Sequence, residues 1–131
     1  MSKSAKVRDC MSTKLVTLGP AMPIHQAIGI LLKNGISGAP VIDEHGRLVG
    51  ILSKKDCLKV AFNASYYQEM GGTVLEYMTP DPETVDAEAD ILHAAERFLN
   101  GPYRRFPVLA DGQTVGLIAR HDVLRALADL W

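Results

Sequence analysis

The stretches GILSKKD (residues 50–56) and GLIARHD (residues 116–122) share one layout, in which a glycine and two apolar residues lead into polar residues and an aspartate. The apolar residues after each glycine predict the end of a strand, and the polar residues that follow predict the start of a helix. The partial positive charge at a helix start stabilises an aspartate in the first turn. The two stretches therefore predict the same strand-to-helix junction at two places in the chain.

The similarity extends well beyond these junctions, because the chain aligns with itself over half its length. At an offset of 67 residues, eight residues from Val7 to Val41 recur from Val74 to Val108, and at an offset of 66 five residues from Gly46 to Leu58 recur from Gly112 to Leu124. Similar apolar residues lie between these identities. The sequence is therefore a tandem repeat.

Each copy predicts the order strand, helix, strand, strand, helix, which makes the fold class α/β. Apolar residues recur at helical spacing from Ile24 to Leu32 and from Ile91 to Leu99, and Gly35 is suited to end the first of these helices. Two β-rich runs around a glycine-containing turn, at 39–52 and 106–118, predict a hairpin in each copy. A second helix is expected to begin near Ser53 and near Arg120.

The predicted organisation is repeat 1 at residues 7–61, a connector at 62–73 and repeat 2 at 74–131. The connector contains Gly71 and Gly72 and small polar residues, which predicts a loop or a frayed helix end. One β-α-β-β-α unit has only a small core. We therefore expect the two sheets to pack together about a pseudo-twofold axis as one disc.

Composition excludes several classes of protein. The chain has 131 residues, of which 47% are hydrophobic, and its formal net charge is −1. Such a balance does not favour a nucleic acid or an anionic membrane as partner. No apolar run is long enough to span a membrane, and the N-terminus does not resemble a signal peptide, so a cytoplasmic location is expected. Cys10 and Cys57 are expected to be buried free thiols, and Trp131 to be packed or interfacial.

The repeated junction has two interpretations. Ser53 and Asp56 lie three residues apart at a helix start, so they can form a helix cap that needs no ligand. The same hydroxyl, carboxylate and backbone N–H groups can bind a ligand that carries both hydroxyl groups and phosphate. Spacing alone does not separate the two.

The combination of segments resembles a known family. VRDCMSTKLVTL, ISGAPVID and GRLVGILSKKD, with their counterparts VLEYMTPDPETV, RRFPVLAD and QTVGLIARHD, are similar to a pair of CBS domains forming a Bateman module. The resemblance covers the chain from about Val7 to Leu127. It implies a regulatory module without catalytic activity, which binds AMP, ADP, ATP or S-adenosylmethionine and which Mg²⁺ could accompany on a polyphosphate.

In the family pattern G-h-h-S/T-x-x-D, where h is an apolar residue, the aspartate holds the ribose and the hydroxyl approaches the phosphate. Ser53 and Asp56 match this pattern. Asp122 matches it as well, but Ala119 stands in place of the hydroxyl, and Arg120 or His121 would have to compensate.

The resemblance implies two sites, each built from both repeats. Arg104 and Arg105 are expected to contact phosphate, because Arg binds phosphate with planar, charge-assisted contacts, and Arg105 is preferred of the two. The first site would combine Ser53 and Asp56 with Thr84, Tyr103, Arg104 and Arg105. The second would combine Arg120 and Asp122 with Val16, Ile36, Ser37 and Ala39, and it is poorer in cations.

The resulting hypothesis is an adenosine-ligand sensor that acts through an unidentified protein partner or through its own homodimer. The alternative is a structural dimerisation or interaction module whose sites are vestigial. An enzyme is not expected, because no nucleophile and base can be assembled from the sequence. The four histidines have no metal-ligand spacing, so no tightly bound metal is expected.

Overall fold

The computed structural model describes residues 5–67 and 71–131, and it divides into two compact units. The first-repeat unit is Val16–Pro82. The second-repeat unit combines Glu83–Trp131 with the described residues up to Leu15. Residues 7–15, which open repeat 1, therefore pack in the second-repeat unit. Residues 74–82, which open repeat 2, pack in the first-repeat unit.

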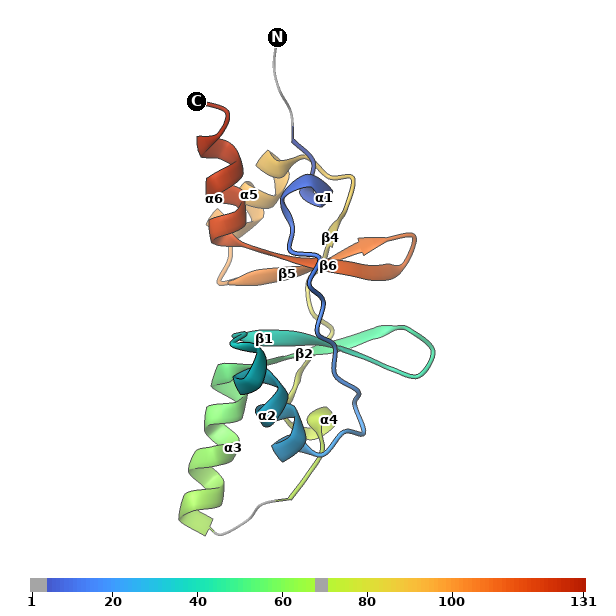
Figure 1. Cartoon of the computed structure of the whole chain (residues 1–131), viewed down its shortest axis with the longest axis vertical. Helices are drawn as coiled ribbons and strands as arrows, with labels where there is room; N and C mark the ends of the chain where they lie inside the picture. Colours follow the sequence, from blue (N-terminus) through green and yellow to red (C-terminus); the bar gives the residue numbers. More distant parts are fainter. Residues whose placement is uncertain (1–4, 68–70) are drawn as a thin grey trace. The chain divides into compact units, whose positions relative to one another are not determined.

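The first-repeat unit contains a three-stranded sheet in the order β1-β2-β3, formed by β1 (Gly38–Ile42), β2 (Leu48–Ser53) and β3 (Thr79–Pro80), all antiparallel to their neighbours. Its helices are α2 (Ile24–Asn34), α3 (Lys54–Tyr67) and the single turn α4 (Val74–Tyr77). Figure 1 shows α2 and α3 on the same face of the β1–β2 hairpin.

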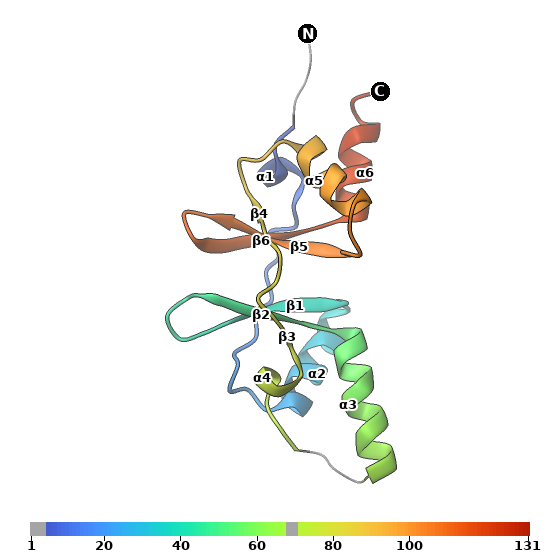
Figure 2. The ribbon, with the colours of Figure 1, turned by 180° about the vertical axis from the view of Figure 1, so that it is seen from behind.

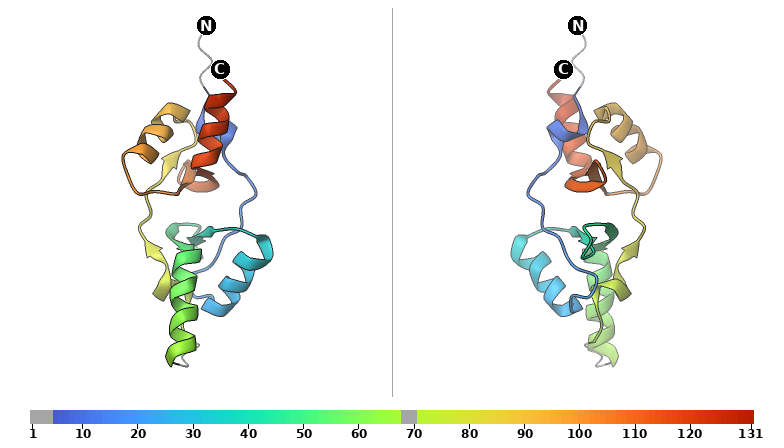
Figure 3. Two further views of the ribbon diagram at one scale, coloured as in Figure 1. Left: turned by 90° about the vertical axis from the view of Figure 1, so that its left-hand side faces the viewer. Right: turned by 90° about the vertical axis from the view of Figure 1, so that its right-hand side faces the viewer.

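The second-repeat unit has the sheet order β4-β5-β6, in which β4 (Val85–Asp86) is parallel to β5 (Arg105–Ala110), and β6 (Gln113–Ala119) is antiparallel to β5. Its helices are the single turn α1 (Val7–Cys10), α5 (Ile91–Leu99) and α6 (Arg120–Ala128). All three lie on one face of the hairpin (Figure 2), and α6 packs against both α1 and α5 (Figure 3).

The predicted helices and hairpins are confirmed, including helix starts at Lys54 and Arg120 and the end of α2 at Gly35, where φ is 61°. The short opening strand of repeat 2 is β4, whereas in repeat 1 it is reduced to a single bridge between Leu18 and Val41. The one-turn helices α1 and α4 were not predicted. The early part of the predicted connector is helical through Tyr67, and residues 68–70 lie outside the described residues.

Each unit has its own apolar core beneath its sheet. The largest buried side chains are Leu18, Ile24, Leu31 and Leu52 in one unit and Phe106, Ile91 and Ile118 in the other. Both cysteines are free: Cys57 is buried, but Cys10 is only half-buried. Trp131 is 91% exposed within the chain, so the expectation that it is packed there is wrong.

Glycine allows a close approach of another segment at the middle of each hairpin. A Cβ atom on Gly50 would lie 2.5 Å from Met78 Sδ and 2.8 Å from the Thr79 carbonyl oxygen. A Cβ atom on Gly116 would meet Met11 Sδ and the Ser12 carbonyl oxygen, each at 2.7 Å. The segment that enters each unit from the other repeat therefore lies close against its hairpin at a glycine.

Candidate functional site

Several of the predicted site residues lie at the end of each sheet where one strand of the hairpin begins and the other ends. This end is called the sheet edge below. In the first-repeat unit, Gly38 at the start of β1 pairs with Ser53 at the end of β2. In the second-repeat unit, Arg105 pairs with Ala119 in the same way. The helix that carries the aspartate begins directly after each of these edges, so the repeated junction has the predicted structure.

Asp56 accepts two hydrogen bonds from Ser53. Its Oδ2 atom lies 2.9 Å from the Ser53 backbone nitrogen and 2.9 Å from Ser53 Oγ. The Asp56 backbone N–H donates in turn to Ser53 Oγ at 3.2 Å. This is a reciprocal helix cap, as one of the two sequence interpretations required. It occupies one carboxylate oxygen, and Oδ1 has no hydrogen bond to the described residues.

The second junction keeps the carboxylate but lacks the hydroxyl. Asp122 Oδ2 accepts from the Ala119 backbone N–H at 2.8 Å, and Asp122 Oδ1 lies 3.1 Å from Nε2 of the exposed His121. The Asp122 side chain is 12% exposed, so the carboxylate is fixed at the end of β6. Both repeats therefore hold an aspartate at the same place with one oxygen bound to a strand-end N–H.

Arg120 has a role in the structure that the sequence did not indicate. Its Nε and Nη2 atoms donate to the Tyr103 carbonyl oxygen at 3.1 and 2.9 Å. This tethers the loop before β5 to the start of α6. In the first-repeat unit a backbone hydrogen bond makes the corresponding link between the loop before β1 and the start of α3. There the Lys54 N–H donates to the Ser37 carbonyl at 2.8 Å.

Arg97 is a residue at this edge that sequence reasoning missed. Its guanidinium donates to the Thr84 carbonyl, lies 3.5 Å from Glu83 Oε2, and stacks 4.4 Å from the centre of the Phe106 ring. It thus fixes the segment that carries Thr84. The signal was available in the repeat alignment, because Arg97 occupies the place of the apolar Ile30.

The remaining predicted residues lie in the unit of their own repeat. Val16, Ile36, Ser37 and Ala39 are in the first-repeat unit together with Ser53 and Asp56. Thr84, Tyr103, Arg104 and Arg105 are in the second-repeat unit together with Arg120 and Asp122. The predicted combination of residues from both repeats in one site stays a prediction. Among the described residues no group of three or more His, Cys, Asp or Glu side chains could hold a metal ion.

A family model for the CBS domain matches the chain twice, at residues 7–63 and 74–129. The chain belongs to the CBS-domain family. Its mixed α/β architecture with two three-stranded sheets is that of solved CBS pairs. CBSX2 of Arabidopsis thaliana, solved in complex with AMP, is 31% identical, with a TM-score of 0.81 over 95% of this chain and 96% of that chain.

Two further relatives widen the comparison. The CBS pair of MJ0100, solved in complex with 5′-methylthioadenosine and S-adenosyl-L-methionine, is 28% identical, with a TM-score of 0.81 over 97% of this chain and 98% of that chain. The A-adding tRNA nucleotidyltransferase of Aquifex aeolicus is 34% identical over 95% of this chain. This chain spans only 14% of that enzyme, and it spans 62% of the full chloroplastic CBSX2.

The helices of the described residues include none that is both long enough and apolar enough to cross a membrane.

Proposed function

We propose that this CBS pair is a regulatory module that binds an adenosine-containing ligand. The observation that carries the proposal is the aspartate fixed at each sheet edge, with one oxygen accepting from the strand-end backbone N–H. A ribose diol needs such a fixed acceptor. Relatives of similar fold are known in complex with AMP, 5′-methylthioadenosine and S-adenosyl-L-methionine, which supports the same ligand class here.

The first proposed site has Ser53 and Asp56 as its hydroxyl and ribose acceptor. Thr84, Tyr103, Arg104 and Arg105 of the other repeat would complete it, and the arginines suit an anionic nucleotide because their contacts to phosphate are charge-assisted. Mg²⁺ would accompany the ligand only if it is a polyphosphate.

The second proposed site has Asp122 as the ribose acceptor, with Val16, Ile36, Ser37 and Ala39 against the base. Arg120 already donates from Nε and Nη2 to the Tyr103 carbonyl, so fewer of its N–H groups are left for a phosphate. This site is therefore proposed for a less charged adenosine compound.

The ligand can be named by thermal unfolding in a panel of AMP, ADP, ATP with and without Mg²⁺, and S-adenosylmethionine. A ligand at 100 times its dissociation constant stabilises the folded state by about 2.7 kcal/mol, a rise of several degrees in Tm for a chain of this size. The panel should single out at least one compound. A panel in which no compound raises Tm would contradict the proposal.

A second candidate is a structural module that acts by forming homodimers, and a separate observation favours it. Large apolar side chains are exposed on the long helices of both units, including Leu32 at 70%, Leu58 at 69%, Leu99 at 86% and Leu124 at 62%. Leu58 and Leu124 occupy equivalent places in the two repeats. A second copy of the chain would bury them, and such a dimer is compatible with ligand binding.

We do not propose catalysis for this CBS pair. The regulated partner and the cytoplasmic location stay predictions from the sequence. The relative CBSX2 is named as chloroplastic, so location varies within the family.

A further inference from the structure

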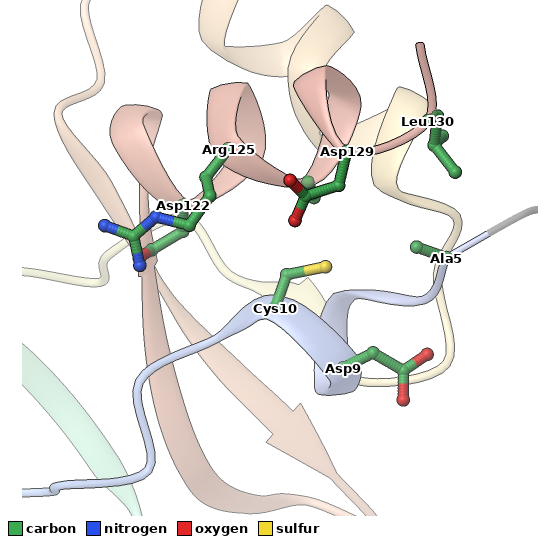
Figure 4. Close-up of a pocket in the computed structure, with 8 residues that line it drawn as sticks. Ala5, Asp9, Cys10, Asp122, Arg125, Asp129 and Leu130 are labelled. Atoms are coloured by element: carbon green, nitrogen blue, oxygen red, sulfur yellow. The ribbon is translucent and has the colours of Figure 1, made fainter.

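A hollow of about 330 Å³ lies in the second-repeat unit between α1 and α6 (Figure 4). Cys10 on α1 faces α6, with Asp129 pointing toward its sulfur (Figure 4). The hollow lies apart from the sheet edge described above and shares only Asp122 with it. Its lining residues are Ala5, Asp9, Cys10, Asp122, Arg125, Ala126, Asp129 and Leu130.

The first-repeat unit shows why this space is open. The elements α4 and α3 correspond to α1 and α6, and Tyr77 occupies the place of Cys10. The Tyr77 ring lies against Gly72, where a Cβ atom would be 2.8 Å from the ring, and the residue packs on the core of its unit. Its hydroxyl donates to the Gly71 carbonyl at 3.1 Å.

A second position adds to the difference. Val60, which is buried on α3, corresponds to Ala126 on α6. The hollow therefore lies where the other repeat has a tyrosine ring and a valine side chain. A space left by replacing large side chains with small ones can accept an aromatic guest: an apolar cavity of roughly 150 Å³ in another protein binds benzene. This hollow has room for a ring with a short chain.

The charged side chains around the hollow determine which charge a bound ligand should carry. Three lining residues are carboxylates. Asp129 points toward the Cys10 sulfur, Asp122 caps α6, and Asp9 accepts from the Lys6 N–H and points away from α6 (Figure 4). Arg125 supplies one guanidinium, which forms no ion pair with them in the part of the chain that is described. Burial, followed by these three carboxylates, raises the pKa of the Cys10 thiol, so the thiol stays neutral at pH 7. The hollow thus offers a neutral wall and an excess of negative charge.

We propose that the hollow between α1 and α6 is a binding site for a small aromatic cation, an aromatic ring carrying an ammonium group on a short chain. The ring takes the space that Tyr77 fills in the other repeat, and the ammonium group faces the carboxylates of α6. This inference does not rest on adenosine binding, although Asp122 lines both sites.

The test uses tyramine as the probe, with 4-ethylphenol as the neutral analogue and 3-(4-hydroxyphenyl)propionate as the anionic analogue. The protein is labelled at its alanine methyl groups, and binding is followed by NMR. Tyramine should shift the methyl resonances of Ala5 and Ala126 and leave that of Ala27, in the other unit, unchanged. Tyramine should bind with a dissociation constant of roughly millimolar or tighter and about fivefold to tenfold more tightly than 4-ethylphenol.

Matched variants locate the site. Ala5→Gly with Cys10→Tyr recreates the Gly72–Tyr77 pair and fills the hollow, so it should reduce tyramine binding at least about tenfold. Cys10→Ser leaves the space open and should bind as the wild type does. If the double variant does not fold, Ala126→Val, which restores the valine of the other repeat, takes its place.

Three outcomes would overturn the proposal. They are unchanged Ala5 and Ala126 methyl resonances, equal affinity for the neutral or anionic analogue, and undiminished binding by the filled variant.

Discussion

At the residue scale, single carboxylates set local structure in this protein through backbone N–H groups. Asp56 and Asp122 each hold a strand end, and Asp43 holds a turn, accepting from the N–H groups of His45 and Arg47 at 2.9 Å each. The Arg47 N–H is the main cause that lowers the pKa of Asp43. The Asp43 carboxylate contributes this stability while it is ionised.

The Asp43 interaction predicts a pH-dependent effect of Asp43→Ala. A lowered folded-state pKa contributes stability above the unfolded value of about 3.9 and loses it as the pH falls through the folded value. The variant should therefore unfold at lower urea concentration than the wild type at pH 7, and the difference should shrink at about pH 2. Glu44→Ala, whose side chain is 87% exposed, is the control and should change little. An equal loss at both pH values would contradict the assignment.

Site residues that recur in both repeats could be predicted from the sequence. Contacts that depend on how the chain folds in three dimensions were missed. The Asp56 and Asp122 pattern is visible in the alignment of the two copies. The tether from Arg120 to the Tyr103 carbonyl depends on the side-chain path across 17 residues, which spacing does not encode. Arg120 was predicted to compensate for the missing hydroxyl, and in the structure it binds protein.

At the element scale, the two strand-to-helix junctions differ by one hydroxyl group. Ser53 Oγ accepts from the Asp56 N–H and donates to the Asp56 carboxylate, whereas Ala119 can do neither. The side chains of Ser53 and Asp56 therefore cap the start of α3 together, whereas Asp122 alone caps the start of α6.

Exchanging these residues should shift stability in opposite directions. Ser53→Ala should lower the free energy of unfolding by about 1 kcal/mol, and Ala119→Ser should raise it by up to about 1 kcal/mol, because an N-cap hydroxyl satisfies a helix-end N–H group. Urea unfolding of both variants measures the change. A stabilising Ser53→Ala or a destabilising Ala119→Ser would show that the cap is not what these positions contribute.

The close approach of Met78 and Thr79 to β2 predicts a strong effect of Gly50→Ala. The new methyl group would lie within 3 Å of Met78 Sδ and of the Thr79 carbonyl oxygen, so the segment must move, at a cost of about 1–3 kcal/mol. Gly29→Ala on α2 is the matched control, because nothing lies within 4 Å of its Cβ position. There the substitution should stabilise the helix by up to about 1 kcal/mol. Equal effects at the two glycines in urea unfolding would refute the close approach.

At the scale of the whole molecule, the sequence predicted the two repeats and their elements but not the exchange of opening segments. Helix periodicity and hairpin turns are local signals, and they placed α2, α5 and both hairpins. Which unit residues 7–15 join depends on contacts such as those of Val7 with Ala89 and Ser12 with Leu117, which are distant in sequence. The packing of the two units into one disc stays a prediction.

The exposed apolar helix faces predict self-association. Leu58→Glu combined with Leu124→Glu should convert the proposed homodimer to a monomer without loss of secondary structure, because both side chains are more than 60% exposed in the single chain. Light scattering coupled to gel filtration gives the mass directly. Lys59→Gln with Arg125→Gln, at the next exposed residues on α3 and α6, changes the net charge by the same amount and is the control for charge. A wild-type protein that is monomeric at high concentration would exclude the dimer.

The central claim is that the fixed aspartates bind an adenosine ligand, and calorimetric titration tests it most directly. The ligand that raises Tm is titrated into the wild type, Asp56→Ala and Asp90→Ala. Asp90 caps α5 by accepting from the Leu92 N–H at 2.8 Å, so its loss matches the cap loss of Asp56→Ala without touching the site. The account predicts that Asp90→Ala binds as the wild type does and that Asp56→Ala binds at least about tenfold more weakly. Equal binding by all three proteins would mean that Asp56 is a helix cap and no more.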